Sequence, residues 1–117
     1  KDQRERKEKM SSCCPKGSLG HLAPSESYVQ KGTIVRVQDL DLYVVGSGET
    51  AVIVVYDIFG FNGGRVRQVC DSLAEQGHTV VLPDFYRGDS WDPANFPPPS
   101  IPELRAWVDR KGDWESI

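Results

Sequence analysis

Two short loops contain the residues whose types and positions suggest chemistry. The first begins with Asp57, two residues after the apolar run 52–55, and continues with glycines at 60, 63 and 64. The second covers residues 84–90, behind the apolar run 79–82, and includes Asp84 and Arg87. A carboxylate at a strand end can take part in catalysis. It can equally accept hydrogen bonds from the backbone N–H groups of its own loop. Arg87 could face a substrate carboxylate, or pair with Asp84 or with backbone groups; for Asp84 we favour a structural role.

The elements around these loops indicate a βαβ unit. Residues 52–55 are apolar without alternation, which predicts a strand covered on both faces at the centre of a parallel sheet. A helix should follow, because apolar residues then recur at helical spacing, with Asn62 as its N-cap and Gly77 at its C-terminus: Val66, Val69, Cys70 and Leu73. Residues 79–82 form the second strand. Ligands in open α/β sheets bind at the carboxyl ends of the strands, where both loops lie.

The flanking segments complete a single predicted domain over residues 28–117. Thr33–Val37 and Leu40–Val45 read as an antiparallel hairpin at the edge of the sheet. Ser100 and Glu103 match a capping box, which begins a helix that ends near Gly112. Residues 91–99 are Pro-rich and could be a lid or a long connection. Residues 1–27 are charge-dense and then irregular, and we expect an arm without regular structure.

Composition excludes several classes of protein. The chain has 117 residues and a net charge of -3, which argues against nucleic acid or an anionic membrane as the main partner. It has no apolar run near the length of about 20 residues that spans a bilayer, and no signal peptide. Three cysteines do not suggest a disulfide framework, so we expect a reducing, cytoplasmic setting. The first residue is Lys rather than Met, which indicates a processed chain or a fragment.

No metal or cofactor is expected. Cys13 and Cys14, with His21 nearby, supply too few ligands at a recognisable spacing, and we interpret the cysteine pair as flexible thiols. Cys70 lies on the apolar stripe of the predicted helix and reads as a small core residue. The loop from Gly60 to Arg65 could hold a nucleotide or another phosphorylated ligand, but its glycine spacing departs from the dinucleotide fingerprint. We therefore favour a tight turn there and keep a small phosphate-binding α/β module as the alternative function.

Three stretches in this order resemble the dienelactone hydrolase family (carboxymethylenebutenolidase-like proteins), whose members have the α/β-hydrolase fold. They are residues 55–62 (Val-Tyr-Asp-Ile-Phe-Gly-Phe-Asn), residues 73–81, and residues 82–89 (Leu-Pro-Asp-Phe-Tyr-Arg-Gly-Asp). The resemblance covers residues 28–117. It implies the N-terminal part of an α/β-hydrolase fold, in which a β-hairpin is followed by a βαβ unit with parallel central strands.

The resemblance also implies a reaction. The family cleaves ester or lactone bonds with a Cys or Ser nucleophile on a G-x-C/S-x-G turn, a His base and an orienting Asp. No such turn occurs in this sequence; in the family it follows the helix that ends here near Gly112. We therefore expect the N-terminal half of a hydrolase that acts on a small-molecule ester, lactone or thioester through an acyl-enzyme. The chain alone is expected to be inactive, and its oligomeric state is left open.

Two site residues, Ile58 and Asp57, follow from the resemblance, and two more, Phe59 and Arg87, are expected from their places in the two loops. The backbone N–H of Ile58 corresponds to an oxyanion-hole donor. Asp57 stands where the family often has a Glu that interacts with the nucleophilic thiol. Phe59 and Arg87 would contact the substrate. A further hypothesis is a truncated product without a settled function, whose unpaired sheet edge makes it marginally stable.

Overall fold

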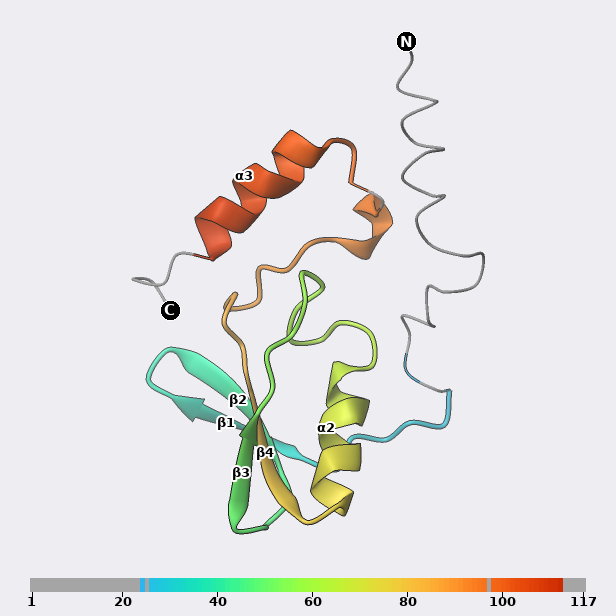
Figure 1. Cartoon of the computed structure of the whole chain (residues 1–117), viewed down its shortest axis with the longest axis vertical. Helices are drawn as coiled ribbons and strands as arrows, with labels where there is room; N and C mark the ends of the chain where they lie inside the picture. Colours follow the sequence, from blue (N-terminus) through green and yellow to red (C-terminus); the bar gives the residue numbers. More distant parts are fainter. Residues whose placement is uncertain (1–23, 25, 97, 113–117) are drawn as a thin grey trace.

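A mixed β-sheet with one helix packed on it forms the main body of the molecule (Figure 1). The computed structural model describes residue 24, residues 26–96 and residues 98–112; most of the predicted N-terminal arm, with Cys13 and Cys14, lies outside these residues. In spatial order the strands are β1 (Thr33–Val37), β2 (Leu40–Val45), β4 (His78–Pro83) and β3 (Thr50–Ile53). β2 is antiparallel to β1 and β4, whereas β3 is parallel to β4. The predicted hairpin and βαβ unit are both confirmed.

The hairpin turns tightly at Gln38, which has a positive φ of 57° and lies between the paired residues Val37 and Leu40. Its two strands differ in burial. β1 is exposed along its whole length, while β2 buries Tyr43 and Val45. This alternation along β2 places one face of the sheet against the core, as expected for an antiparallel strand.

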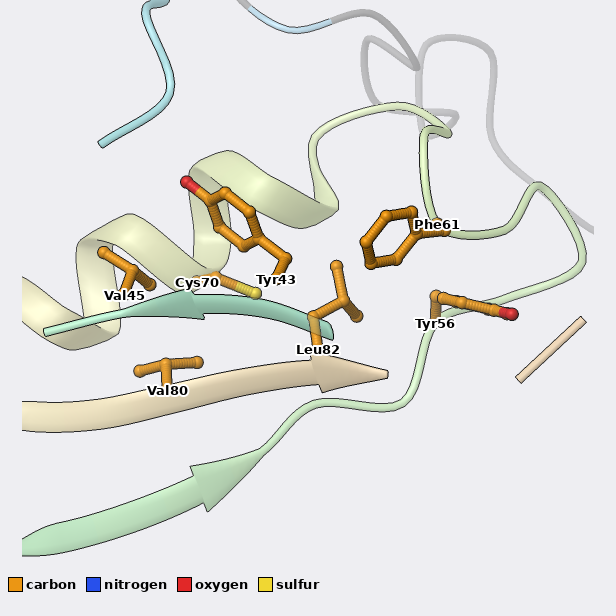
Figure 2. Packing of buried hydrophobic residues seen from close by; sticks show 7 residues of the cluster. All are labelled: Tyr43, Val45, Tyr56, Phe61, Cys70, Val80 and Leu82. Carbon is orange, nitrogen blue, oxygen red and sulfur yellow. The ribbon is translucent and has the colours of Figure 1, made fainter. Parts of the chain in front are cut away.

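Helix α2 (Val66–Glu75) covers that face of the sheet (Figure 2). Cys70 is fully buried against the sheet, where Tyr43, Val80 and Leu82 are also fully buried. The predicted apolar stripe is confirmed in part, because Val69 is 51% exposed. Gly77 has the left-handed φ of 97° that the helix end was expected to require.

The predicted N-cap of α2 is wrong. The N-cap residue is Arg65, which makes no side-chain capping hydrogen bond. Asn62 lies in the turns before the helix, and its Oδ1 accepts a hydrogen bond from Arg67 Nη2 at 2.6 Å. The two glycines at 63 and 64 extend the loop by turns of their own, so the helix begins later than the position of Asn62 suggests.

The burial predicted for the first central strand is also wrong within the described residues. β3 lies at the edge of the sheet order, and only β4 pairs with it there. Ile53 is 68% exposed and Val55 is 72% exposed. α2 covers one face of the sheet, so the apolar residues that point to the other face meet no described element. An uninterrupted apolar run thus indicates that both faces of a strand are suited to burial. It does not show that other elements cover both faces.

Helix α3 (Ile101–Lys111) lies beyond the carboxyl ends of β3 and β4 (Figure 1). Ser100 Oγ accepts a hydrogen bond from the Glu103 N–H at 3.2 Å, so Ser100 caps the start of this helix as the sequence predicted. The short 3₁₀ helix η1 (Pro93–Asn95) precedes it. Among residues 24, 26–96 and 98–112, neither α2 nor α3 has the length and apolarity needed to span a bilayer.

Candidate functional site

The loop after β3 and the loop after β4 meet at the carboxyl ends of the two parallel strands (Figure 1). The Trp91 N–H donates to the Ile58 carbonyl oxygen at 2.7 Å. Gly60 lies against Ser90, and a Cβ built on Gly60 would come within 2.5 Å of the Ser90 Cβ. These contacts bring together the two segments that the sequence singled out for chemistry.

Tyr56, just before the first loop, connects it to the second loop through its hydroxyl. Its hydroxyl donates to Asp84 Oδ1 at 3.0 Å and accepts a hydrogen bond from the Tyr86 N–H. Tyr56 and Asp84 are each 7% exposed, and burial is the largest cause of the raised pKa of the Tyr56 hydroxyl. The Asp84 N–H in turn donates to the Asp41 carbonyl oxygen on β2 at 2.8 Å. The structural role that the sequence favoured for Asp84 agrees with these contacts.

Asp57 has an exposed side chain that bonds to its own loop. Its Oδ1 accepts a hydrogen bond from the Phe59 N–H at 2.9 Å, which is the local backbone contact considered as an alternative to a site carboxylate. Burial, and then the charge of Asp57, raise the pKa of the Tyr86 hydroxyl. The carboxylate is therefore close enough to the second loop to affect its electrostatics.

Ile58 and Phe59 are half-buried in this loop. The Ile58 carbonyl oxygen is used by Trp91, but its N–H donates to no acceptor within the part of the chain that the structure describes. Phe59 packs edge-to-face on Phe96, with ring centroids 5.5 Å apart. Residues 91–96 thus lie beside the first loop.

Arg87 forms an ion pair with a carboxylate of the hairpin. Its Nε donates to Asp39 Oδ2 at 2.9 Å, across to the turn of the β1–β2 hairpin. The hydrogen bond from Arg87 is the largest cause of the lowered pKa of Asp39. Arg87 itself has a positive φ of 51° and is followed by Gly88 with a φ of 84°. The loop after β4 therefore turns the guanidinium towards the hairpin.

Two N–H groups of the glycine loop are used inside the loop. The Gly60 N–H donates to the Asp57 carbonyl oxygen and the Gly63 N–H to the Gly60 carbonyl oxygen, both at 3.1 Å. Backbone N–H groups directed at the loop's own carbonyl oxygens are not directed at a phosphate. These two hydrogen bonds form the tight turn that the sequence led us to expect.

Sequence reasoning missed two side-chain clusters. The first is aromatic and connects the second loop to α3, with Tyr86 and Trp91 each edge-to-face on Trp107 at 5.1 and 5.6 Å. The second centres on Asp71, a buried carboxylate on α2 that accepts hydrogen bonds from the Tyr28 and Tyr43 hydroxyls at 2.7 and 2.6 Å. The density of aromatic residues between 85 and 107 could have indicated the first cluster. A carboxylate next to Cys70 was the only sequence signal for the second.

A shallow cavity of about 260 Å³ lies elsewhere, on α2, and is lined by Arg65, Gln68, Val69, Ser72 and Leu73. Its lining includes none of the four site residues expected from the sequence. The described residues contain no group of three or more His, Cys, Asp or Glu side chains that could hold a metal ion. The meeting point of the two strand-end loops is therefore the candidate site.

Comparison with known proteins matches the same region of the chain. The model of the dienelactone hydrolase family matches residues 40–110, which include both loops. An uncharacterized AIM2 family protein of Schizosaccharomyces pombe is 42% identical over 97 residues, covering 80% of this chain and 38% of that protein. The carboxymethylenebutenolidase homolog of Rattus norvegicus is 41% identical over 85 residues, covering 69% of this chain and 33% of that protein.

A more distant relative is hydrolase tropI of Talaromyces stipitatus, 33% identical over 83 residues, with 68% of this chain and 30% of that protein covered. No solved structure matches the chain. The chain spans about a third of the length of these curated relatives. The family match covers more than half of the chain, and the resemblance found in its sequence is confirmed: the chain belongs to the dienelactone hydrolase family.

Proposed function

We propose that this chain forms one wall of the active site of a dienelactone hydrolase-like enzyme that cleaves an ester, lactone or thioester of a small molecule. The observation that supports this most strongly is the match of the family to residues 40–110, which include both strand-end loops. The contact between Trp91 and Ile58 joins these loops at the carboxyl ends of β3 and β4. Ligands gather at this edge of open α/β sheets.

In the proposed reaction, a Cys or Ser from the rest of a longer protein attacks the carbonyl carbon of the substrate. The carbonyl oxygen becomes an oxyanion, and the Ile58 N–H donates a hydrogen bond to it. The His takes the proton of the attacking nucleophile and passes it to the alcohol or thiol that leaves. Water then attacks the acyl-enzyme, which releases the acid and restores the nucleophile. A fixed donor of this kind typically lowers the barrier by about 3–4 kcal/mol. The Ile58 N–H donates to no acceptor among the described residues, which supports this assignment.

The neighbouring residues have supporting roles in the proposal. Asp57 would interact with the nucleophile, with a shorter reach than the Glu often found there in the family. Phe59 would contact the apolar part of the substrate. Arg87 would bind a substrate carboxylate, which requires the guanidinium to exchange its bond with Asp39 for one with the substrate. The exposed position of the Asp39 carboxylate, at 70% side-chain exposure, favours such an exchange, because exposed ion pairs are weak.

A chimera tests the proposal. Residues 40–110 of this chain replace the matching segment of the rat relative, and turnover is measured with an ester that the unmodified rat protein hydrolyses. We expect the chimera to hydrolyse the ester and the 117-residue chain alone to show no turnover, because it has no G-x-C/S-x-G nucleophile turn. A folded chimera without activity would refute the proposal. The cytoplasmic location remains part of the proposal and is tested by fractionation of the native protein.

A further inference from the structure

Tyr56 occupies a central place between the two strand-end loops, although its side chain faces the core. It precedes Asp57 and Ile58 directly in the chain, so its backbone sets where the first loop begins. Its hydroxyl ends on the second loop, where it bonds both the Asp84 carboxylate and the Tyr86 N–H. One side chain therefore fixes the base of one loop to the base of the other.

We propose that the Tyr56 hydroxyl is the positioning group for the oxyanion donor: by bridging Asp84 and Tyr86, it holds the Ile58 amide in place. The inference rests on the proposed function for its catalytic meaning. Tyr56 itself touches no reacting atom and acts through the loop that it anchors. Because the N–H of an oxyanion hole must be placed before charge develops, a shift of about 1 Å is enough to cost about 100-fold in rate.

The four contacts of Tyr56, two by its ring and two by its hydroxyl, indicate why the hydroxyl has this role. The ring packs on Phe85 and Tyr86, with centroids 6.0 and 4.9 Å away, and these contacts would survive in Tyr56→Phe. The hydroxyl is the group that satisfies a buried carboxylate and a backbone N–H at once. Without the hydroxyl, the hydrogen bonds that link the base of the first loop to Asp84 and Tyr86 are lost. The Trp91–Ile58 bond then remains as the direct hydrogen bond between the two loops among the described residues.

The chain contains a matched control at Tyr43. Its hydroxyl also donates to a buried carboxylate, Asp71, and also accepts from a backbone N–H, that of Gly32 at 2.9 Å. Tyr43 is fully buried, and its hydroxyl points towards α2, away from the Tyr56 hydroxyl (Figure 2). Tyr43→Phe and Tyr56→Phe therefore delete the same chemical group from similar surroundings, but only the second deletion lies at the candidate site.

Amide hydrogen exchange of the 117-residue chain tests the positioning directly. We expect Tyr56→Phe to speed exchange of the Trp91 and Gly60 N–H groups at least about tenfold relative to Tyr43→Phe. The Trp91 N–H bonds across to Ile58, and the Gly60 N–H closes the turn that contains Ile58, so both amides report how firmly Ile58 is held. Tyr43→Phe should instead speed exchange at Gly32 and Lys31, which are bonded to the Tyr43 and Asp71 side chains. Equal exchange at Trp91 and Gly60 in the two variants would overturn the inference.

Turnover of the chimera provides the second readout. We expect Tyr56→Phe to lower kcat by about 10- to 100-fold with KM within about twofold, and Tyr43→Phe to leave kcat within about twofold. If the unsubstituted chimera is active and both variants lose kcat equally, Tyr56 is only a stability residue and the inference fails. If the unsubstituted chimera has no turnover, the proposed function fails, and the exchange experiment alone decides whether Tyr56 positions the loop.

Discussion

Gly60 and Ser90 lie so close that any side chain at position 60 would displace the second strand-end loop from the first. Gly60 has a φ of 80°, and a Cβ there would come within 2.5 Å of the Ser90 Cβ. Gly88 has a similar φ of 84°, but a Cβ there would meet nothing within 4 Å. A substitution at Gly88 therefore tests backbone strain alone, whereas a substitution at Gly60 adds crowding against Ser90.

The first prediction concerns this pair. Gly88→Ala should lower the free energy of unfolding by about 1–2 kcal/mol, the cost of a left-handed Ala. Gly60→Ala should cost about 3 kcal/mol or more, because crowding against Ser90 adds to the same strain. Urea unfolding of both variants measures the difference. Equal losses in the two variants would mean that the loops are not in contact at Ser90.

The second prediction concerns the buried carboxylate of Asp71. It accepts hydrogen bonds from Tyr28, Tyr43 and the Lys31 N–H, which attach the segment before β1 to α2. Asp71→Asn has about the same volume but provides only one acceptor oxygen, so at least one buried donor loses its partner. We expect a loss of about 2 kcal/mol in unfolding free energy. Asp109→Asn, on the exposed surface of α3, is the control and should change stability by less than about 0.5 kcal/mol. A loss at Asp71 no larger than at Asp109 would contradict the hydrogen-bond network.

The third prediction concerns pH and Cys70. Burial raises the pKa of the Cys70 thiol from 9.0 to about 11, because the thiolate is disfavoured in the core. The folded state thus holds the proton more tightly than the unfolded state. The resulting stability is fully present below pH 9 and is lost as the pH rises towards 11. This contribution to the free energy of unfolding is up to about 3 kcal/mol, since one pKa unit corresponds to about 1.4 kcal/mol.

Unfolding free energies of the parent chain and Cys70→Ala, measured from pH 8 to pH 10.5, isolate this contribution. The difference between the two curves should narrow as the pH rises, because the variant lacks the thiol. Buried tyrosines titrate in both proteins and cancel in the difference. Parallel curves would show that Cys70 does not titrate differently in the folded and unfolded states.

The fourth prediction concerns the outer edge of β3. Among the described residues, nothing pairs with this edge, and Ile53 and Val55 beside it are 68% and 72% exposed. Such an edge accepts strands from other chains. We expect the 117-residue chain to associate as its concentration rises and Ile53→Lys to suppress the association. Val108→Lys, at 42% exposure on α3, introduces the same charge away from the sheet and should not suppress it. Sedimentation velocity distinguishes these outcomes, and equal effects of both substitutions would point to net charge instead of the edge.

The sequence predicted those parts of the fold that depend on local pattern. The alternation along β2, the helical spacing of Val66, Cys70 and Leu73, and the N-cap at Ser100 all appear where expected. Each depends on residues within one or two turns of each other, so periodicity is sufficient to find it. The motif pair in the two strand-end loops also led to the correct family.

Contacts between distant segments could not be predicted in this way. Arg87 pairs with Asp39, which lies 48 positions earlier, although Asp84 stands much nearer in the sequence. The positive φ at Arg87 turns its side chain towards the hairpin, and the residue type does not predict that backbone angle. The exposure of Ile53 likewise depends on which strand lies beside β3. The residues of a strand do not by themselves predict which strand will pair with it. The hydroxyl of Tyr56 was missed because a tyrosine in an apolar run resembles an ordinary core residue.

The most direct test of the proposed site removes a single hydrogen-bond donor, the N–H of Ile58. In the chimera, Ile58 is replaced by its α-hydroxy acid, which converts the amide into an ester and deletes the donor without changing the side chain. We expect kcat to fall by about 100- to 1000-fold with KM within about twofold. The same replacement at the exposed Gly88 is the control and should change kcat by less than about threefold. If the Ile58 ester retained kcat within threefold of the unmodified chimera, the loop after β3 would not supply the oxyanion donor.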